Sequence, residues 1–232
     1  MSRSRKKNSN VTEIQASAAF HIQPMNKKQS ALLNAIYHST MTIAIGTAGT
    51  GKTFCSASKV AQLFLKGGYD KIVLTRPNVS TGRSVGFFPG TVEEKLGVWL
   101  QPLLTVLKEA FGDGRYEYLI SKKQIMIQPL ETVRGQSFRD ALILVDECQN
   151  LEWGEIEALT TRIGDNSKMI LMGDPKQSDV ANGMAIEKFV TMCKKYNIEI
   201  PVVRFGLDDV VRSDIVGQLV KAFFYEGTNK KK

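Results

Sequence analysis

Eight consecutive residues have the types and spacing of a phosphate-binding loop. They follow the pattern G-x-x-x-x-G-K-[ST], formed here by Gly46, Thr47, Ala48, Gly49, Thr50, Gly51, Lys52 and Thr53. Glycines let the backbone curl so that its N–H groups face phosphate oxygens, Lys52 supplies a cation for the β- and γ-phosphates, and the Thr53 hydroxyl suits Mg²⁺. The loop therefore predicts a site for a nucleoside triphosphate, in which we include the next residue, Phe54.

Two acidic residues follow an apolar run further along the chain. Residues 141–145 read Ala-Leu-Ile-Leu-Val and are followed by Asp146 and Glu147. A phosphate-loop protein needs a carboxylate at such a strand end to hold Mg²⁺ through its water shell, and Asp146 is our candidate. Glu147 is placed to polarise a water for attack on the γ-phosphate, as a general base. The alternative is a pair of strand-end acids that cap the next turn.

A neutral amide follows the next apolar run. Residues 168–172 lead into Gly-Asp-Pro-Lys and then Gln177. Ligands of open α/β sheets bind at the carboxyl ends of strands, so we expect Gln177 to contact the γ-phosphate or the attacking water. Alone, Gly-Asp-Pro is only a turn signal, but its position behind the first two motifs makes it more specific.

Strand-like and helix-like segments alternate from about Pro24 onward. This order is typical of the α/β class, with a parallel sheet covered by helices on both faces. Strands are expected at residues 42–45, 71–75, 124–128, 141–145, 168–172 and 199–205. Helices are expected at residues 27–37, 52–66, 92–111, 152–163, 183–195 and 209–224. The helix that begins at Lys52 would add the positive end of its dipole to the phosphate site.

Length and charge limit the organisation of the chain. It has 232 residues and a formal net charge of +8, from 31 Lys and Arg against 23 Asp and Glu. We expect a single domain over residues 24–226, between a basic, disordered N-terminal tail of residues 1–23 and a basic C-terminal tail of residues 227–232. The charge favours a polyanionic partner such as RNA or single-stranded DNA; the alternative is tails that only aid solubility.

The sequence gives little indication of a membrane segment, a disulfide framework or a zinc site. No apolar stretch approaches the ~18–20 residues that cross a bilayer, and no hydrophobic run follows the basic N-terminal residues. We therefore expect a cytoplasmic protein with no membrane contact. The three cysteines are scattered and predict neither a disulfide framework nor a zinc site.

Taken together, these motifs resemble the PhoH-like family of predicted ATPases, which is itself similar to the first motor domain of superfamily-one helicases. The resemblance covers about residues 24–224 and rests on residues 46–53, 75–77, 86–90 with 94–95, 134–135, 145–150, 161–164, 173–177 and 209–213. Many members have Ala where this chain has Cys148, a small-for-small change that should matter little.

The resemblance implies a RecA-like P-loop NTPase sheet with ATP as the nucleotide. In that sheet the strand before the phosphate loop is flanked by the strand that ends at Gly173, and the strand that carries Asp146 lies beyond it. The resemblance also implies that Gln29 contacts adenine, because one amide can bond N6 and N7 together. From the sequence alone, Gln29 is an ordinary helix-surface residue.

Two arginines are implied to contact nucleic acid. Arg76 and Arg134 fall where related motors touch the nucleic-acid backbone. The alternative for both is a structural ion pair.

Another arginine is implied to reach an ATP phosphate. Arg212 is expected to open the last helix and resembles an arginine that helicases supply from a second motor domain. This chain has no room for such a domain, so a neighbouring subunit would complete the site. We therefore expect a homo-oligomer, by resemblance a hexameric ring. Arg162 and Arg204 are lesser candidates, and the alternative for Arg212 is a salt bridge to Asp208 or Asp209.

Two functions remain open on this basis. The first is an oligomeric, helicase-like, Mg²⁺-dependent ATPase that acts on RNA or single-stranded DNA. The second is an ATP-switched nucleic-acid-binding or regulatory module with little turnover. Phosphate transfer to a small molecule is disfavoured, because Glu147 and Gln177 suit water rather than an acceptor hydroxyl.

Overall fold

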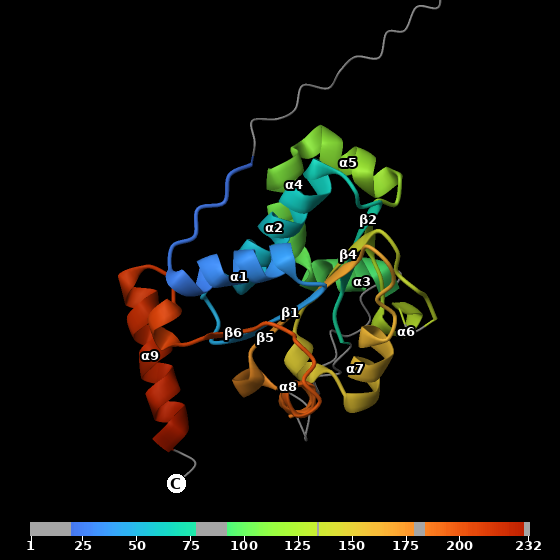
Figure 1. Ribbon diagram of the computed structural model, residues 1–232. Helices are drawn as coiled ribbons and strands as arrows, with labels where there is room; N and C mark the ends of the chain where they lie inside the picture. Colours follow the sequence, from blue (N-terminus) through green and yellow to red (C-terminus); the bar gives the residue numbers. More distant parts are fainter. Residues whose placement is uncertain (1–19, 78–91, 134, 179–183, 230–232) are drawn as a thin grey trace, which may run out of the picture.

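A parallel sheet forms the centre of the computed structural model, which describes residues 20–77, 92–133, 135–178 and 184–229 (Figure 1). Within these residues the strand order is β3-β2-β4-β5-β1-β6, and every pairing is parallel. The strands are β1 (Met41–Gly46), β2 (Lys71–Thr75), β3 (Ile125–Ile127), β4 (Ala141–Val145), β5 (Lys168–Gly173) and β6 (Val202–Phe205). The predicted α/β class and the order of the three central strands are confirmed.

Helices cover both faces of this sheet (Figure 1). One face carries α1 (Lys27–His38), α2 (Lys52–Lys66), α3 (Val92–Trp99), α4 (Gln101–Phe111) and α5 (Asp113–Ser121). The other face carries α6 (Leu130–Val133), α7 (Trp153–Thr160) and α8 (Ala185–Lys195). The last helix, α9 (Asp214–Asn229), lies at one end of the molecule, and short 3₁₀ turns occur at η1 (Cys148–Asn150), η2 (Pro175–Gln177) and η3 (Leu207–Asp209).

The strands are apolar because the two helix layers bury both of their faces. All five residues of β4 are buried, and in β1 the side chains of Ile43 and Ile45 face one core while Ala44 faces the other. Apolar residues at successive positions are what such a doubly covered strand requires. The parallel register then brings the carboxyl ends of β4, β5 and β1 to the same edge of the sheet.

Two predicted helices differ most from those observed, while those expected over residues 152–163 and 183–195 are shorter, at Trp153–Thr160 and Ala185–Lys195. The helix expected over residues 92–111 is divided at Leu100, because Pro102 lies in the first turn of α4 and cannot donate a backbone hydrogen bond within a longer helix. The helix expected over residues 209–224 begins only at Asp214. Asp209 instead closes η3, where its carboxylate accepts a hydrogen bond from the Gly206 N–H at 2.8 Å.

Candidate nucleotide-binding site

The phosphate loop lies between β1 and α2 in the geometry its glycines were expected to allow. Gly49 and Gly51 have φ values of +77° and +83°, which residues with a side chain adopt only with strain. A Cβ on Gly46 would overlap the Phe205 carbonyl, so this position has no room for a side chain. Residues 48–53 line a cavity at the start of α2, where a helix N-terminus favours an anion.

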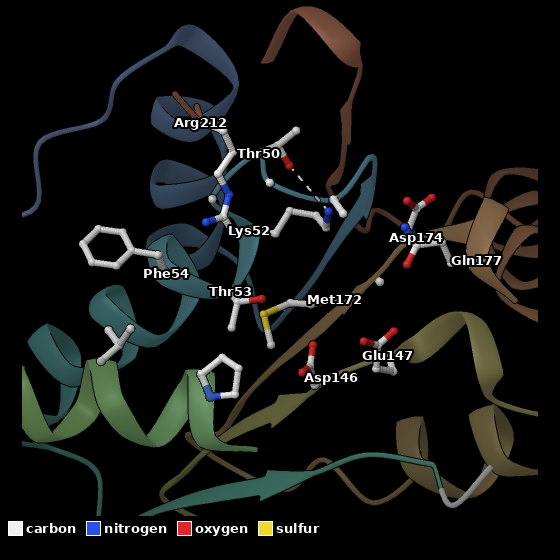
Figure 2. A pocket seen from close by; sticks show the side chains of 16 residues that line it. Thr50, Lys52, Thr53, Phe54, Asp146, Glu147, Met172, Asp174, Gln177 and Arg212 are labelled. Carbon is white, nitrogen blue, oxygen red and sulfur yellow. Dashed lines mark hydrogen bonds between the residues drawn. The ribbon is translucent and has the colours of Figure 1, made fainter. Parts of the chain in front are cut away.

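Lys52 lies inside this loop with its ammonium against the backbone. The Nζ atom donates to the carbonyl oxygens of Gly46 at 2.7 Å and Thr47 at 2.8 Å, and it lies near the Thr50 hydroxyl (Figure 2). Burial lowers the pKa of Lys52, while the carboxylates of Asp174 and Asp146 oppose that shift. A cation held at the loop, with acidic side chains across the cavity, is suited to a phosphate and a metal between them.

Asp146 and Glu147 follow β4 on the opposite wall of the cavity (Figure 2). Burial, followed by the charge of Glu147, raises the pKa of Asp146 to about 6, and Arg76 and Lys52 oppose that shift. Glu147 has a φ of +52°, which is unusual for a residue with a side chain and turns the chain sharply after the strand. Its carboxylate accepts a hydrogen bond from the side-chain amide of Gln149.

A cavity of about 370 Å³ joins these elements at the edge of the sheet. This volume is within the range of small-ligand pockets. The lining residues are Ala48, Gly49, Thr50, Gly51, Lys52, Thr53, Phe54, Pro102, Val106, Asp146, Glu147, Met172, Gly173, Asp174, Gln177 and Arg212. In Figure 2, Arg212 and Phe54 lie on one side of the cavity, and Glu147 and Gln177 lie on the other.

The donor set also fits Mg²⁺ held jointly with a phosphate. The Thr53 hydroxyl and the Asp146 carboxylate are oxygen ligands of the kind that Mg²⁺ prefers, and both face the cavity (Figure 2). Among the described residues there is no group of three or more His, Cys, Asp or Glu that could hold a metal. The protein would therefore hold the ion through these two residues together with phosphate oxygens and water.

Gln29 is buried rather than on the helix surface, so that alternative is wrong. Its side chain is 3% exposed and packs over Gly51, where a Cβ would approach Nε2 to 2.6 Å. Nε2 donates to the Thr50 carbonyl at 3.0 Å, and Oε1 accepts from the Met25 N–H at 2.8 Å. Gln29 therefore supports the phosphate loop from behind, and its predicted contact with adenine stays a prediction.

Arg76 lies at the end of β2, with its guanidinium 4.9 Å from the centre of the Trp99 ring. Its Nε is buried and has no hydrogen-bond partner among the described residues. Its charge also opposes the raised pKa of Asp146, so Arg76 lies near enough to interact with that carboxylate. Its contact with nucleic acid stays a prediction, and Arg134 lies outside the described residues.

Arg212 reaches the cavity of its own chain. It does not open α9 as predicted but precedes it, and a Cβ on Gly49 would come within 3.2 Å of its Cγ. The adjacent Val211 N–H donates to the Gly49 carbonyl at 3.0 Å, which fixes this segment against the loop. No hydrogen bond or ion pair joins Arg212 to another of the described residues, so the predicted alternative of a salt bridge to Asp208 or Asp209 is not observed.

The two lesser arginine candidates lie elsewhere. Arg204 forms two hydrogen bonds of 2.7 Å with the Glu187 carboxylate, which makes it part of a structural ion pair. Arg162 is exposed beyond the end of α7, and its carbonyl accepts from the Phe138 N–H at 3.0 Å. Neither arginine lines the cavity.

Sequence reasoning missed two polar residues, Asp174 in the cavity lining and Gln149 behind it. Gln149 is 1% exposed and Asp174 is 8% exposed, and the Asp174 N–H donates to Gln149 Oε1 at 3.0 Å. The signal available in the sequence for Gln149 was a polar residue two positions after Glu147, within the segment 145–150 that carries the family resemblance. Nothing in the sequence pairs Gln149 with the end of β5, which depends on the parallel register of β4 and β5.

Comparisons with a family model and with known proteins agree on one family. The family model described as PhoH-like protein matches residues 21–224. A PhoH-like protein of Bacillus subtilis (strain 168) is 33% identical over 92% of this chain and 66% of its own length. Protein PhoH of Escherichia coli (strain K12) is 31% identical over 85% of this chain and 57% of its own length. The chain thus spans about three fifths of the length of these relatives.

Solved structures extend the comparison of the fold. The large terminase of a thermophilic bacteriophage, in complex with ATP-gamma-S, superposes with a TM-score of 0.52 at 16% identity, over 83% of this chain and 48% of that one. The complex of the same terminase with ADP gives a TM-score of 0.51 at 14% identity, over 83% of this chain and 48% of that one. At this identity the likeness concerns the fold, a RecA-like P-loop domain. Within the described residues, no helix has the length and apolar character needed to span a membrane.

Proposed function

Because the chain belongs to the PhoH-like protein family, we propose that it binds ATP together with Mg²⁺ and hydrolyses the γ-phosphate. The observation that carries this proposal is the convergence of a phosphate-loop lysine, two strand-end carboxylates, an amide and an arginine on one cavity. These residues are Lys52, Asp146, Glu147, Gln177 and Arg212. A simple binding site would need the lysine and the metal ligands, whereas Glu147 adds a base for attack by water.

Each of these side chains then has a role in ATP hydrolysis that follows from its position in the cavity. Lys52 turns from the loop carbonyls to the phosphates, and the backbone N–H groups of the loop bind phosphate oxygens. Thr53 and Asp146 hold Mg²⁺, which when bound withdraws negative charge from the phosphates. Glu147 accepts a proton from the attacking water, while Gln177 on the same side orients that water or the γ-phosphate. Arg212 contributes positive charge from the Phe54 side.

ATP is the nucleotide we propose because a bacteriophage terminase of similar fold is described in complex with ATP-gamma-S. The remaining parts of the proposal concern partners. We propose RNA or single-stranded DNA as the effector, supported by the net charge of +8. We also propose that the protein is cytoplasmic. We propose a homo-oligomer, supported by the exposed apolar side chains of α9, among them Ile215, Leu219 and Phe223.

The experiment that tests this function is phosphate release from ATP and Mg²⁺, with and without single-stranded RNA and DNA. The control is Lys52→Ala, which removes the loop cation and reports contaminating ATPases. We expect turnover by the native protein, none above background by Lys52→Ala, and stimulation by one nucleic acid.

Together with equilibrium binding of an ATP analogue, the other outcomes of this experiment separate the alternatives. Turnover without stimulation would contradict the nucleic-acid part and leave the ATPase part in place. ATP binding without turnover would contradict hydrolysis and favour the ATP-switched module. Absence of ATP binding would contradict the proposal as a whole.

A further inference from the structure

We propose that Gln149 is a positioning residue that holds the base, Glu147, and the end of β5 in one fixed arrangement. Gln149 lies in η1, directly after the sharp turn at Glu147, and its side chain is almost fully buried. It does not line the cavity, so it would act through its neighbours rather than on the nucleotide. The inference rests on the proposed function, because it takes Glu147 as the base.

The two ends of the Gln149 amide have different partners. Nε2 donates to the Glu147 carboxylate, and Oε1 accepts from the Asp174 N–H at 3.0 Å. The carbonyl of Gln149 also accepts from the Ser178 hydroxyl at 3.2 Å, beyond η2. One buried amide thus links the carboxylate that follows β4 to the backbone that leads from β5 toward Gln177.

The residue at the end of β5, Gly173, leaves space for this amide. A Cβ on Gly173 would overlap Gln149 Oε1 and lie 3.0 Å from both Gln149 N and Cys148 Sγ. Gly173 does not have a positive φ, so its backbone alone would accept a side chain. Space for Gln149 and Cys148, rather than backbone conformation, therefore favours a glycine at this position.

This arrangement has a consequence for the base. Glu147 is a partly exposed, flexible side chain whose backbone lies in a left-handed turn, and a carboxylate free to rotate would spend time away from the water it should activate. A donor that is itself held by a buried backbone N–H fixes one oxygen of the carboxylate, and Glu147 lines the cavity with its carboxylate held in this way. A buried amide with a hydrogen bond at each end is a strong orienting group.

The variant that tests the inference is Gln149→Met, which keeps the length and volume of the side chain and removes both hydrogen bonds. We expect kcat for ATP hydrolysis to fall about tenfold or more, while the Kd of ATP changes less than about threefold. The matched control is Gln128→Met, because Gln128 is also a buried glutamine at a strand end and lies outside the cavity. It should leave both quantities within twofold.

Two readouts separate positioning from a general loss of structure. Hydrogen exchange of the Asp174 amide, which needs no turnover, should become at least about tenfold faster in Gln149→Met and stay unchanged in Gln128→Met. In single-turnover assays, Glu147→Gln with Gln149→Met should be no slower than Glu147→Gln alone, because Gln149 acts through Glu147. Gly173→Ala, which displaces the amide without removing it, should repeat the kcat effect if Gln149→Met does not fold.

Several results would overturn the inference. These are near-native kcat in Gln149→Met despite fast exchange at Asp174, native exchange at Asp174, or a double variant whose losses multiply. A different result identifies failure of the proposed function: Glu147→Gln that hydrolyses ATP at the native rate. In that case a crystal structure of Gln149→Met still decides whether the Glu147 carboxylate leaves its place.

Discussion

The electrostatics of the cavity depend on a few buried side chains of opposite charge. Burial lowers the pKa of Lys52 and raises that of Asp146, so burial disfavours the charged form of each. Asp174 and Asp146 favour the charged form of Lys52, whereas for Asp146 the charges of Arg76 and Lys52 favour the carboxylate and that of Glu147 opposes it. The types of these residues and their place at strand ends could be predicted from the sequence. The burial of Gln29 and the bonds of Gln149 could not, because both depend on contacts between segments far apart in the chain.

Replacement of the base should separate binding from turnover. In Glu147→Gln the side chain keeps its size but cannot accept a proton from water, so we expect ATP affinity within about threefold of native and a loss of kcat of about 10²-fold or more. Single-turnover hydrolysis and equilibrium binding of a fluorescent ATP analogue measure the two quantities. Native turnover in this variant would show that another group is the base.

The three cysteines should be unreactive in the folded protein. Burial raises the pKa of Cys55 to about 11 and also raises the pKa of Cys148 and Cys193. Since the thiolate is the reactive form, a higher pKa leaves less of it at pH 8. We expect slow labelling by a maleimide at pH 8 and labelling of all three thiols in guanidinium chloride. Fast labelling of the native protein at any of them would contradict the burial described for that residue.

At the scale of elements, the apolar runs were enough to predict the sheet. The bounds of β2, β4 and α2 agree with those expected, because each is a continuous pattern bounded by polar or glycine residues. Helix ends were less predictable where a local bond decides them, as at Asp209, and α5 was missed. The approach of β6 to the phosphate loop had no sequence signal, since it depends on the register of Gly46 against Phe205.

This approach gives a stability prediction. Gly46→Ala would place a Cβ on the Phe205 carbonyl at a φ of +134°, so β1 and β6 would have to separate. Strain of ~1–3 kcal/mol is typical of such sites and corresponds to about 2–4 °C in Tm per kcal/mol for a chain of this size. The control is Gly114→Ala in α5, where no atom lies within 4 Å of the added Cβ. Thermal unfolding should show a lower Tm for Gly46→Ala and an equal or higher Tm for Gly114→Ala.

At the scale of the whole molecule, the position of Arg212 changes what an assembly would need to supply. The sequence suggested that a neighbour completes the site, but Arg212 lies in the cavity of its own chain. An oligomer is then not required to bring this arginine to the nucleotide.

Mixed variants test this assignment. Arg212→Ala should lower kcat/KM about tenfold, mainly through KM, because the side chain lies on the Phe54 side and away from Glu147. Mixing Arg212→Ala with Glu147→Gln should restore no activity, because each chain then carries one defect in its own cavity. Recovery on mixing, with co-assembly shown by size-exclusion chromatography, would mean that the arginine acts between subunits.

The first and last helices are tied to the phosphate loop by neighbouring bonds. Gln29 of α1 holds the Thr50 carbonyl, Val211 before α9 holds the Gly49 carbonyl, and the Asn26 side chain joins the two segments through the Asp209 carbonyl at 3.2 Å. The segments that flank the domain core on both sides are therefore bonded to the backbone that would hold the phosphates. A movement of the loop on nucleotide binding would be transmitted to α1 and to the segment before α9 together.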